Sequence, residues 1–312
     1  MIEVIDATRE QWLAMRGIGG SDAAAACGLD PRKSALALWC EKTGALPSAN
    51  LDLVEAVQWG NRLESAICAQ IMAEFKLVPS LGKTGAETAC TYRGQRLMRS
   101  RALPWQTCTY DGIVQGRADC LGFIEAKNVG AYMSDEWPDE GMPDRVMAQV
   151  WHGFAVSPLL QFCVVGALVG GNELRTRFIQ RTECEEQIAA LCQVEGEFER
   201  MVRDGEQPAA DGSASSANAL KLLHPDDNGK SVTLDASLVA GREALKESVK
   251  ATEKAIDAID NAIRQAMGPA TFGLLSDGSG TFSWKTQDRA GYVVKPGKSR
   301  VLRFSQTKGG VR

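Results

Sequence analysis

Histidine is nearly absent from this chain, which has only His152 and His224 among its 312 residues. Two scattered histidines are too few for a histidine-bound zinc site or for a Ser-His-Asp triad. We therefore expect His152 to be packed or solvated rather than catalytic. Any hydrolytic chemistry of this chain has to use other side chains.

Closely spaced cysteines are also lacking, although the chain has nine cysteines. No two of them form a Cys-x-x-Cys pair, so the spacing lacks the close pairs typical of iron–sulfur clusters. The number is odd and most of them lie in apolar runs, which disfavours a disulfide framework. The pattern favours reduced, buried thiols in a cytosolic protein.

Long hydrophobic runs are missing too. The longest apolar run, residues 159–169, suits a buried strand and is too short to span a membrane. The N-terminus has no basic region followed by an apolar one, as a signal peptide would. We therefore expect a cytoplasmic protein with no membrane partner.

The chain has no excess of positive charge, since its net charge is −4. Proteins that bind nucleic acid usually carry a basic surface, so any contact of this chain with DNA must be focused on a local basic channel. The remaining composition is ordinary for a globular protein. It has 44% hydrophobic and 24% charged residues, which is enough for a sizeable core.

Hydrophobic periodicity predicts the order of the secondary structure. Helices are expected at residues 9–13, 22–27, 58–75, 143–156 and 183–203, and strands at 107–114, 119–127, 159–169 and 173–180. The strongest helix signal is residues 58–75, where an apolar stripe recurs every four positions at Trp59, Leu63, Ile67, Ile71 and Phe75. This order of helices and strands indicates an α/β or α+β fold with a mixed central sheet flanked by helices.

Composition divides the chain into three regions. We predict a first domain over residues 1–207, a linker over 208–231 and a C-terminal region over 232–312. The C-terminal region holds a long helix, 238–267, and a hairpin, 272–284, before a basic tail. Apolar positions of the long helix alternate in steps of four and three, which is coiled-coil spacing. We hypothesise that this helix packs against the core, a neighbouring subunit or another protein; a plain structural helix is the alternative.

Acidic residues and a lysine on two neighbouring strands carry the chemical signal. Glu125 and Lys127 project from one face of their strand, and pairing with the preceding strand can bring Asp111 beside Glu125. Two carboxylates this close repel each other unless a cation or a proton lies between them. Mg²⁺ would bind them, polarise a phosphate and activate a water, while Lys127 would balance negative charge. Glu-x-Lys alone is also common as a surface ion pair on an exposed strand.

Asp111 followed by Glu125-x-Lys127 on adjacent strands resembles the PD-(D/E)xK nuclease motif. More specifically, residues 8–205 resemble the YqaJ-like viral recombinase family, relatives of phage lambda exonuclease, in four ordered blocks. The blocks are Arg16-Gly17-Ile18-Gly19-Gly20-Ser21-Asp22, Trp59-Gly60-Asn61-Arg62-Leu63-Glu64, the Asp111, Glu125 and Lys127 set, and Met147-Ala148-Gln149-Val150-Trp151-His152. One departure is Tyr110, which stands where the motif name has proline.

The resemblance implies a restriction-endonuclease-like mixed sheet and a Mg²⁺-dependent deoxyribonuclease, with Mn²⁺ as a substitute. It implies a 5′→3′ exonuclease that degrades one strand of double-stranded DNA from its ends in phage-type recombination. A ring-shaped homotrimer, a single-strand annealing recombinase as partner, and the cytoplasm of a bacterial or phage-infected cell are implied as well. Two alternatives stay open: a restriction-like or structure-selective DNA endonuclease, and a non-catalytic DNA-binding or assembly module.

The same resemblance assigns roles to single residues. The implied metal ligands are Asp111, Glu125, Glu64 and Ala126, and the implied catalytic set adds Lys127 and Gln149, with Gln149 orienting the lysine or the water. Arg16, Ser21 and Thr109 would bind the DNA 5′-phosphate, because glycines before a helix can present N–H groups to an anion and Arg16 supplies a fork of donors. A surface role for Glu64 and a structural amide at Gln149 are the alternatives.

Overall fold

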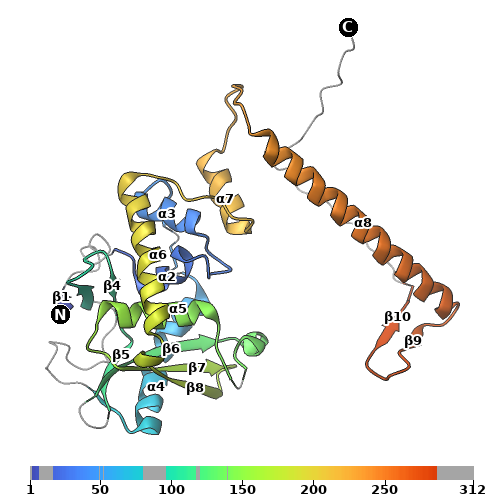
Figure 1. Ribbon diagram of the computed structural model, residues 1–312. Helices are drawn as coiled ribbons and strands as arrows, with labels where there is room; N and C mark the ends of the chain where they lie inside the picture. The colour runs from blue at the N-terminus through green and yellow to red at the C-terminus, as the bar shows by residue number, and fades with distance from the viewer. Residues whose placement is uncertain are drawn as a thin grey trace. The chain divides into compact units, whose positions relative to one another are not determined.

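The computed structural model of the chain describes residues 2–6, 17–48, 50–51, 53–79, 96–116, 120–138 and 140–286. The chain divides into two compact units, Met1–His224 and Pro225–Arg312 (Figure 1). The predicted domain boundaries at residues 207 and 231 stay predictions. No helix in the described part combines the length and the apolar character that a membrane span requires.

The first unit is built around a five-stranded mixed sheet with strand order β2-β5-β6-β7-β8. Its strands are β2 (Val78–Pro79), β5 (Gly112–Gln115), β6 (Leu121–Val129), β7 (Phe162–Val169) and β8 (Glu173–Gln180). The central pair, β6 and β7, is parallel, and the other neighbours are antiparallel. A second, antiparallel sheet has the order β1-β3-β4 and consists of β1 (Ile2–Asp6), β3 (Arg96–Ser100) and β4 (Thr107–Cys108).

Helices cover both faces of the five-stranded sheet (Figure 1). The helices of this unit are α2 (Gly20–Ala26), α3 (Ala35–Thr43), α4 (Glu55–Phe75), α5 (Asp144–Val156), α6 (Glu185–Asp204) and α7 (Ala214–Leu223), with the 3₁₀ turns η3 (Ala131–Glu136) and η4 (Arg181–Glu183). On one face, Ile67 of α4 packs against Ile124 of β6. On the other face, Phe154 of α5 packs against Phe123.

Burial on both faces explains why β7 reads as a nearly continuous apolar run. The predicted mixed central sheet flanked by helices is confirmed.

The strand predicted over residues 107–114 is in fact two strands in different sheets. β4 pairs with β3 and β5 pairs with β6, so the chain changes sheet at residues 109–111. Burial of Tyr110 accompanies the change, since its ring enters the core and its hydroxyl donates to the Gly153 carbonyl at 2.6 Å. As a consequence, Asp111 lies in a bend just before β5 rather than inside a strand.

The predicted linker contains a helix, α7. Ala219 of α7 packs against Leu36 and Cys40 of α3, and the Ser213 hydroxyl caps the helix by accepting from the Ser216 amide at 3.1 Å. A few apolar residues are enough to bury one helix face, which a composition rich in Ser, Ala and Gly conceals. The helix predicted over residues 9–13 lies outside the described residues.

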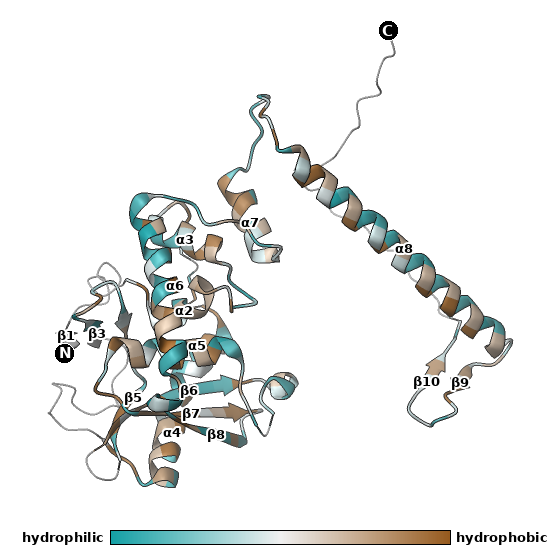
Figure 2. Cartoon of the chain, viewed as in Figure 1, coloured by the Kyte–Doolittle hydropathy of each residue, from teal (hydrophilic) through white to brown (hydrophobic). Residues whose placement is uncertain are grey.

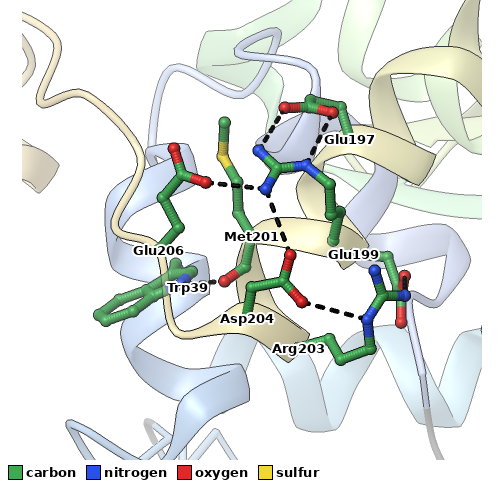
Figure 3. Close-up of polar contacts among 8 residues, drawn as sticks. Trp39, Glu197, Glu199, Met201, Arg203, Asp204 and Glu206 are labelled. Carbon is green, nitrogen blue, oxygen red and sulfur yellow. Dashed lines mark hydrogen bonds and ion pairs between the residues drawn. The ribbon is translucent and has the colours of Figure 1, made fainter.

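Charged side chains gather at the C-terminal end of α6 (Figure 3). Arg200 pairs there with three acidic side chains, Glu197, Asp204 and Glu206. Such exposed ion pairs contribute little to stability individually. The Trp39 indole, by contrast, donates to the Met201 carbonyl at 3.2 Å and so connects α3 to α6.

The described part of the second unit contains one long helix and a small hairpin. The helix is α8 (Ala236–Met267), and the hairpin pairs β9 (Phe272–Leu274) with β10 (Thr281–Ser283). Asp235 caps α8, because its side chain accepts from the Ser237 amide at 2.8 Å. The predicted C-terminal helix and hairpin are therefore confirmed, while the basic tail lies outside the described residues.

Candidate active site

Asp111, Glu125 and Lys127 meet at the end of the β5–β6 ladder. The last paired residues are Gly112 and Ile124, so Asp111 and Glu125 each stand one step beyond that pair. The Asp111 Oδ2 atom accepts from the Ala126 amide at 2.7 Å, and the Lys127 Nζ atom donates to Glu125 Oε1 at 2.5 Å. The fold thus brings the three predicted side chains together.

Strand alternation determines which face of the sheet these side chains use. Phe123, two residues before Glu125, enters the core under α5, whereas Ile124 enters the core under α4. Glu125 and Lys127 therefore project on the α5 side. Their side chains keep 17% and 27% of their surface exposed, so solvent and a substrate can reach them.

Glu64 approaches the same place from α4. Cys68, one helical turn later, has its Sγ atom 3.8 Å from the Asp111 carbonyl oxygen. The negative charge of Glu64 also contributes to the raised pKa of Asp111. The predicted third carboxylate is thus near enough to Asp111 to affect it electrostatically, although its helix covers the opposite face of the sheet.

Burial and neighbouring charges at this site shift the pKa values of Asp111 and Lys127. Burial raises the pKa of Asp111 well above its usual value, and the charges of Glu125 and Glu64 add to that, against the opposing effect of Lys127. Burial lowers the pKa of Lys127, but the charges of Glu125 and Asp111 outweigh burial and raise it overall. The site therefore holds a protonated lysine among crowded carboxylates, and a bound cation would relieve their repulsion.

The donor set fits Mg²⁺. Mg²⁺ binds through one or two carboxylates and keeps several waters, so Asp111 and Glu125 are sufficient. The Ala126 carbonyl can add an oxygen, because the N–H and C=O of one strand residue point to the same neighbouring strand and its N–H points to Asp111. In the described residues, no three His, Cys, Asp or Glu side chains form a ready-made metal cluster.

A cavity of about 280 Å³ opens beside Lys127. It is lined by α2, the loop after α2, the end of β6, η3 and the first turns of α5, and its lining includes Ser21, Arg32, Lys127, Arg145 and Gln149. Lys127, Gln149 and Ser21 were predicted as site residues, and the cavity brings them to one place. Arg32 and Arg145 were not predicted, because no motif marks either of them.

Two buried polar atoms of this cavity lack a hydrogen-bond partner in the described part of the chain. They are the Gln149 Oε1 atom and the Trp137 Nε1 atom. An unpaired buried donor or acceptor is costly, so both atoms are suited to a water or a ligand in the cavity. Arg175 of β8 fixes the backbone of the cavity wall that includes Trp137, because its guanidinium donates to the carbonyls of Ser134 and Trp137.

The predicted 5′-phosphate pocket is described only in part. Arg16 lies outside the described residues. Ser21 is exposed on α2, and Thr109 follows β4. These segments adjoin, since a Cβ added at Gly20 would lie 3.9 Å from the Cys108 Sγ atom. One detail differs from the expectation, because the Gly19 amide donates to the side chain of Asp22 at 3.1 Å and is therefore not free for a bound phosphate.

The glycines before α2 have a steric reason as well. A Cβ at Gly17 would lie 2.0 Å from the Trp105 carbonyl oxygen, so a larger residue cannot fit there. The Lys42 Nζ atom then donates both to the Gly17 carbonyl and to Asp22, at 2.6 and 2.7 Å. These contacts fix α2, and with it Ser21, against the rest of the unit.

His152 is packed, which is one of the two placements that the sequence predicts. Its side chain is fully buried, with Nδ1 2.7 Å from Glu195 and Nε2 2.9 Å from the Thr107 carbonyl. Burial lowers the pKa of His152, but the charge of Glu195 outweighs it, so the pKa lies above its usual value. The eight described cysteines are free thiols, as expected, and burial raises the pKa of Cys27 to about 12.

Comparison with known proteins finds a matching family model, a relative and similar solved structures. Residues 11–159 match the YqaJ-like viral recombinase domain. A relative from Bacillus subtilis (strain 168), "Uncharacterized protein YqaJ", is 28% identical over 281 residues, covering 86% of this chain and 82% of the relative. Two solved structures are also similar, each 20% identical to this chain: an alkaline exonuclease, LHK-Exo from Laribacter hongkongensis, with a TM-score of 0.39, and LHK-Exo in complex with dAMP, with a TM-score of 0.41. Each match covers 64% of this chain and 100% of the solved chain. The resemblance predicted from the four motifs is confirmed, since residues 11–159 match the model of the YqaJ-like viral recombinase domain.

Proposed function

We propose that this chain is a metal-dependent 5′→3′ exonuclease that degrades one strand of double-stranded DNA from its ends. The observation that carries the proposal is the meeting of Asp111, Glu125 and Lys127 at one end of the β5–β6 ladder. Two carboxylates, a backbone carbonyl and a lysine form a donor set suited to phosphodiester hydrolysis.

Asp111, Glu125 and the Ala126 carbonyl would hold Mg²⁺, or Mn²⁺ in its place, with Glu64 close enough to bind a water of the ion. When bound, such an ion polarises the phosphate and lowers the pKa of a water molecule. The Lys127 ammonium, raised in pKa and hydrogen-bonded to Glu125, stays charged and offsets negative charge on the phosphate. Gln149, at the cavity wall beside Lys127, orients that ammonium or the water.

The cavity supports a nucleic-acid substrate. Arg32, Arg145 and Lys127 give it three cationic side chains against the single carboxylate of Asp30. Arg145 pairs with Glu136 at 2.6 Å, whereas the exposed Arg32 guanidinium donates to the Met133 sulfur at 3.6 Å. A local cationic surface of this kind lets a chain of net charge −4 bind phosphates. Ser21, Thr109 and Arg16 would take the terminal 5′-phosphate.

The proposal includes the setting of the reaction. A ring-shaped homotrimer would gather the cationic side chains in one channel around DNA and so concentrate the positive potential of an acidic protein. A single-strand annealing recombinase would take over the strand that remains, in phage-type recombination in the cytoplasm of a bacterial or phage-infected cell. The family description, a viral recombinase domain, supports this setting.

The test compares wild type with Lys127→Ala on 5′-phosphorylated linear duplex, with and without Mg²⁺. Wild type should release mononucleotides only with Mg²⁺, while Lys127→Ala should bind the duplex and cut very little. Lys221→Ala, an exposed lysine on α7, is the matched control and should behave as wild type. Nicking of closed circular DNA would instead establish the endonuclease alternative. Absence of Mg²⁺-dependent cleavage by folded wild type would favour a non-catalytic module.

A further inference from the structure

Helix α8 exposes its whole apolar stripe. None of its 32 residues is buried by the described part of the chain. Leu245 is 71% exposed, and Ile256 is still 53% exposed. Figure 2 shows apolar and polar residues alternating along the length of α8. At 1.5 Å per residue, the helix is roughly 48 Å long, so the stripe is a long, narrow surface of the kind that coiled coils bury.

The stripe has a consistent heptad register. Positions a are Arg242, Val249, Ile256 and Ile263, and positions d are Leu238, Leu245, Thr252 and Ile259. The flanking columns differ sharply from each other. Column e carries charge along its middle, with Lys246, Glu253 and Asp260 between the apolar Val239 and Met267, whereas column g is small throughout, with Gly241, Ser248, Ala255 and Ala262. One edge of the stripe is thus charged and the other allows close approach.

These columns favour an antiparallel partner of the same sequence over a parallel one. In a parallel pair, column e faces column g, so the charges of Lys246 and Glu253 would meet only small residues. The two Arg242 side chains would also face each other at an a position. In an antiparallel pair, column e faces column e and column g faces column g, which joins charge with charge and small with small.

One antiparallel register satisfies every column except at Arg242, which lies opposite the partner's Ile259. With Val249 opposite Thr252, Leu245 meets the partner's Ile256 and Leu238 meets the partner's Ile263. Lys246 then lies beside the partner's Glu253, and Arg242 beside the partner's Asp260. On the other edge, Ser248 faces the partner's Ala255 and Gly241 faces the partner's Ala262. No like charges meet in this register.

We infer that α8 pairs antiparallel with α8 of a second copy of this chain, with Val249 opposite Thr252 and Lys246 beside the partner's Glu253. The chain therefore associates through its second unit, whatever the association of the first. If the first units form trimers, α8 pairs join trimers to each other. The inference is independent of the nuclease activity.

The test measures the molar mass of the full chain by light scattering across a concentration series. Leu245→Asp should halve the mass relative to wild type. Lys246→Glu, which places like charges at both ends of the pair, should weaken association by about tenfold. The double variant Lys246→Glu/Glu253→Lys restores opposite charges in the antiparallel register only, so it should recover the wild-type mass.

Lys254→Glu is the matched control, since Lys254 lies at an outer f position, and its mass should equal that of wild type. Circular dichroism checks that every variant keeps its helix content. The inference is overturned if Leu245→Asp leaves the mass unchanged, which would mean that the tail of the same chain or a different protein covers the stripe. It is also overturned if the double variant fails to restore the association lost in Lys246→Glu.

Discussion

Gly153 of α5 is the position where one methyl group should disturb both stability and catalysis. A Cβ there would lie 2.8 Å from Cζ of Phe123 and 3.3 Å from Cε1 of Tyr110. Phe123 cannot retreat easily, since it is 1% exposed and packs edge-to-face on Tyr110 and Phe154, with ring centroids 5.1 Å apart in both cases. Such overpacking costs about 1–3 kcal/mol, and alanine recovers about 1 kcal/mol of helix propensity.

The net cost is therefore about 0–2 kcal/mol. Because Phe123 cannot retreat easily, we expect Gly153→Ala to lower the free energy of unfolding by about 1–2 kcal/mol, the upper half of that range. The turnover number should fall by about tenfold or more, because Tyr110 anchors the residue beside Asp111 and small displacements of reacting groups are costly. Urea denaturation and single-turnover cleavage of a linear duplex measure the two effects. Gly196→Ala in α6 is the control: its Cβ would meet only Trp105 Cζ2 at 3.6 Å, so it should stabilise the protein slightly. A Gly153→Ala protein as stable and as active as wild type would refute this reasoning.

Three further predictions concern charge. Because the folded pKa of His152 is raised, the stability it adds is fully present below its usual pKa of 6.5 and is lost as pH rises through the folded pKa. As pH rises above 6.5, the difference in free energy of unfolding between wild type and His152→Gln/Glu195→Gln should therefore fall, with a slope of at most about 1.36 kcal/mol per pH unit. A difference that does not change with pH would contradict this prediction. In metal-free buffer, Asp111→Asn should be more stable than wild type, because it removes the repulsion from Glu125 and Glu64 and keeps an acceptor for the Ala126 amide; its thermal midpoint should no longer respond to Mg²⁺. Arg32→Ala should leave stability unchanged but weaken duplex binding and reduce its salt dependence by about one ion, and an unchanged salt slope would remove Arg32 from the DNA path.

Periodicity predicted the elements that are long and regular. Helix α4 and strand β8 lie close to the predicted ranges, because each repeats one apolar pattern over its full length. The stripe of α4 was predicted to include Trp59, which is 46% exposed, because the core cluster under α4 includes Leu63 but not Trp59. Pattern strength therefore decided which elements could be predicted, and tertiary contact decided where each one begins.

The site shows a similar division. Asp111, Glu125 and Lys127 could be predicted because two short strands and a fixed spacing carry them. Arg32 and Trp137 could not, since they reach the cavity from a loop and a 3₁₀ turn whose positions depend on packing. Trp137 in particular is placed by Arg175 of β8, a contact between residues 38 positions apart in the sequence.

The break between β4 and β5, which alternation of side chains does not predict, is also what makes the carboxylate of Asp111 available. In an unbroken strand, a backbone carbonyl at this step would accept the Ala126 amide, and the Asp111 side chain would follow the pleat. Because Tyr110 instead turns into the core and bonds to Gly153, the Asp111 carboxylate takes the place of that carbonyl. One carboxylate oxygen completes the ladder, and the other can bind a cation beside Glu125. A tyrosine in the position of the motif's proline therefore ends the ladder at the carboxylate that we propose as a metal ligand.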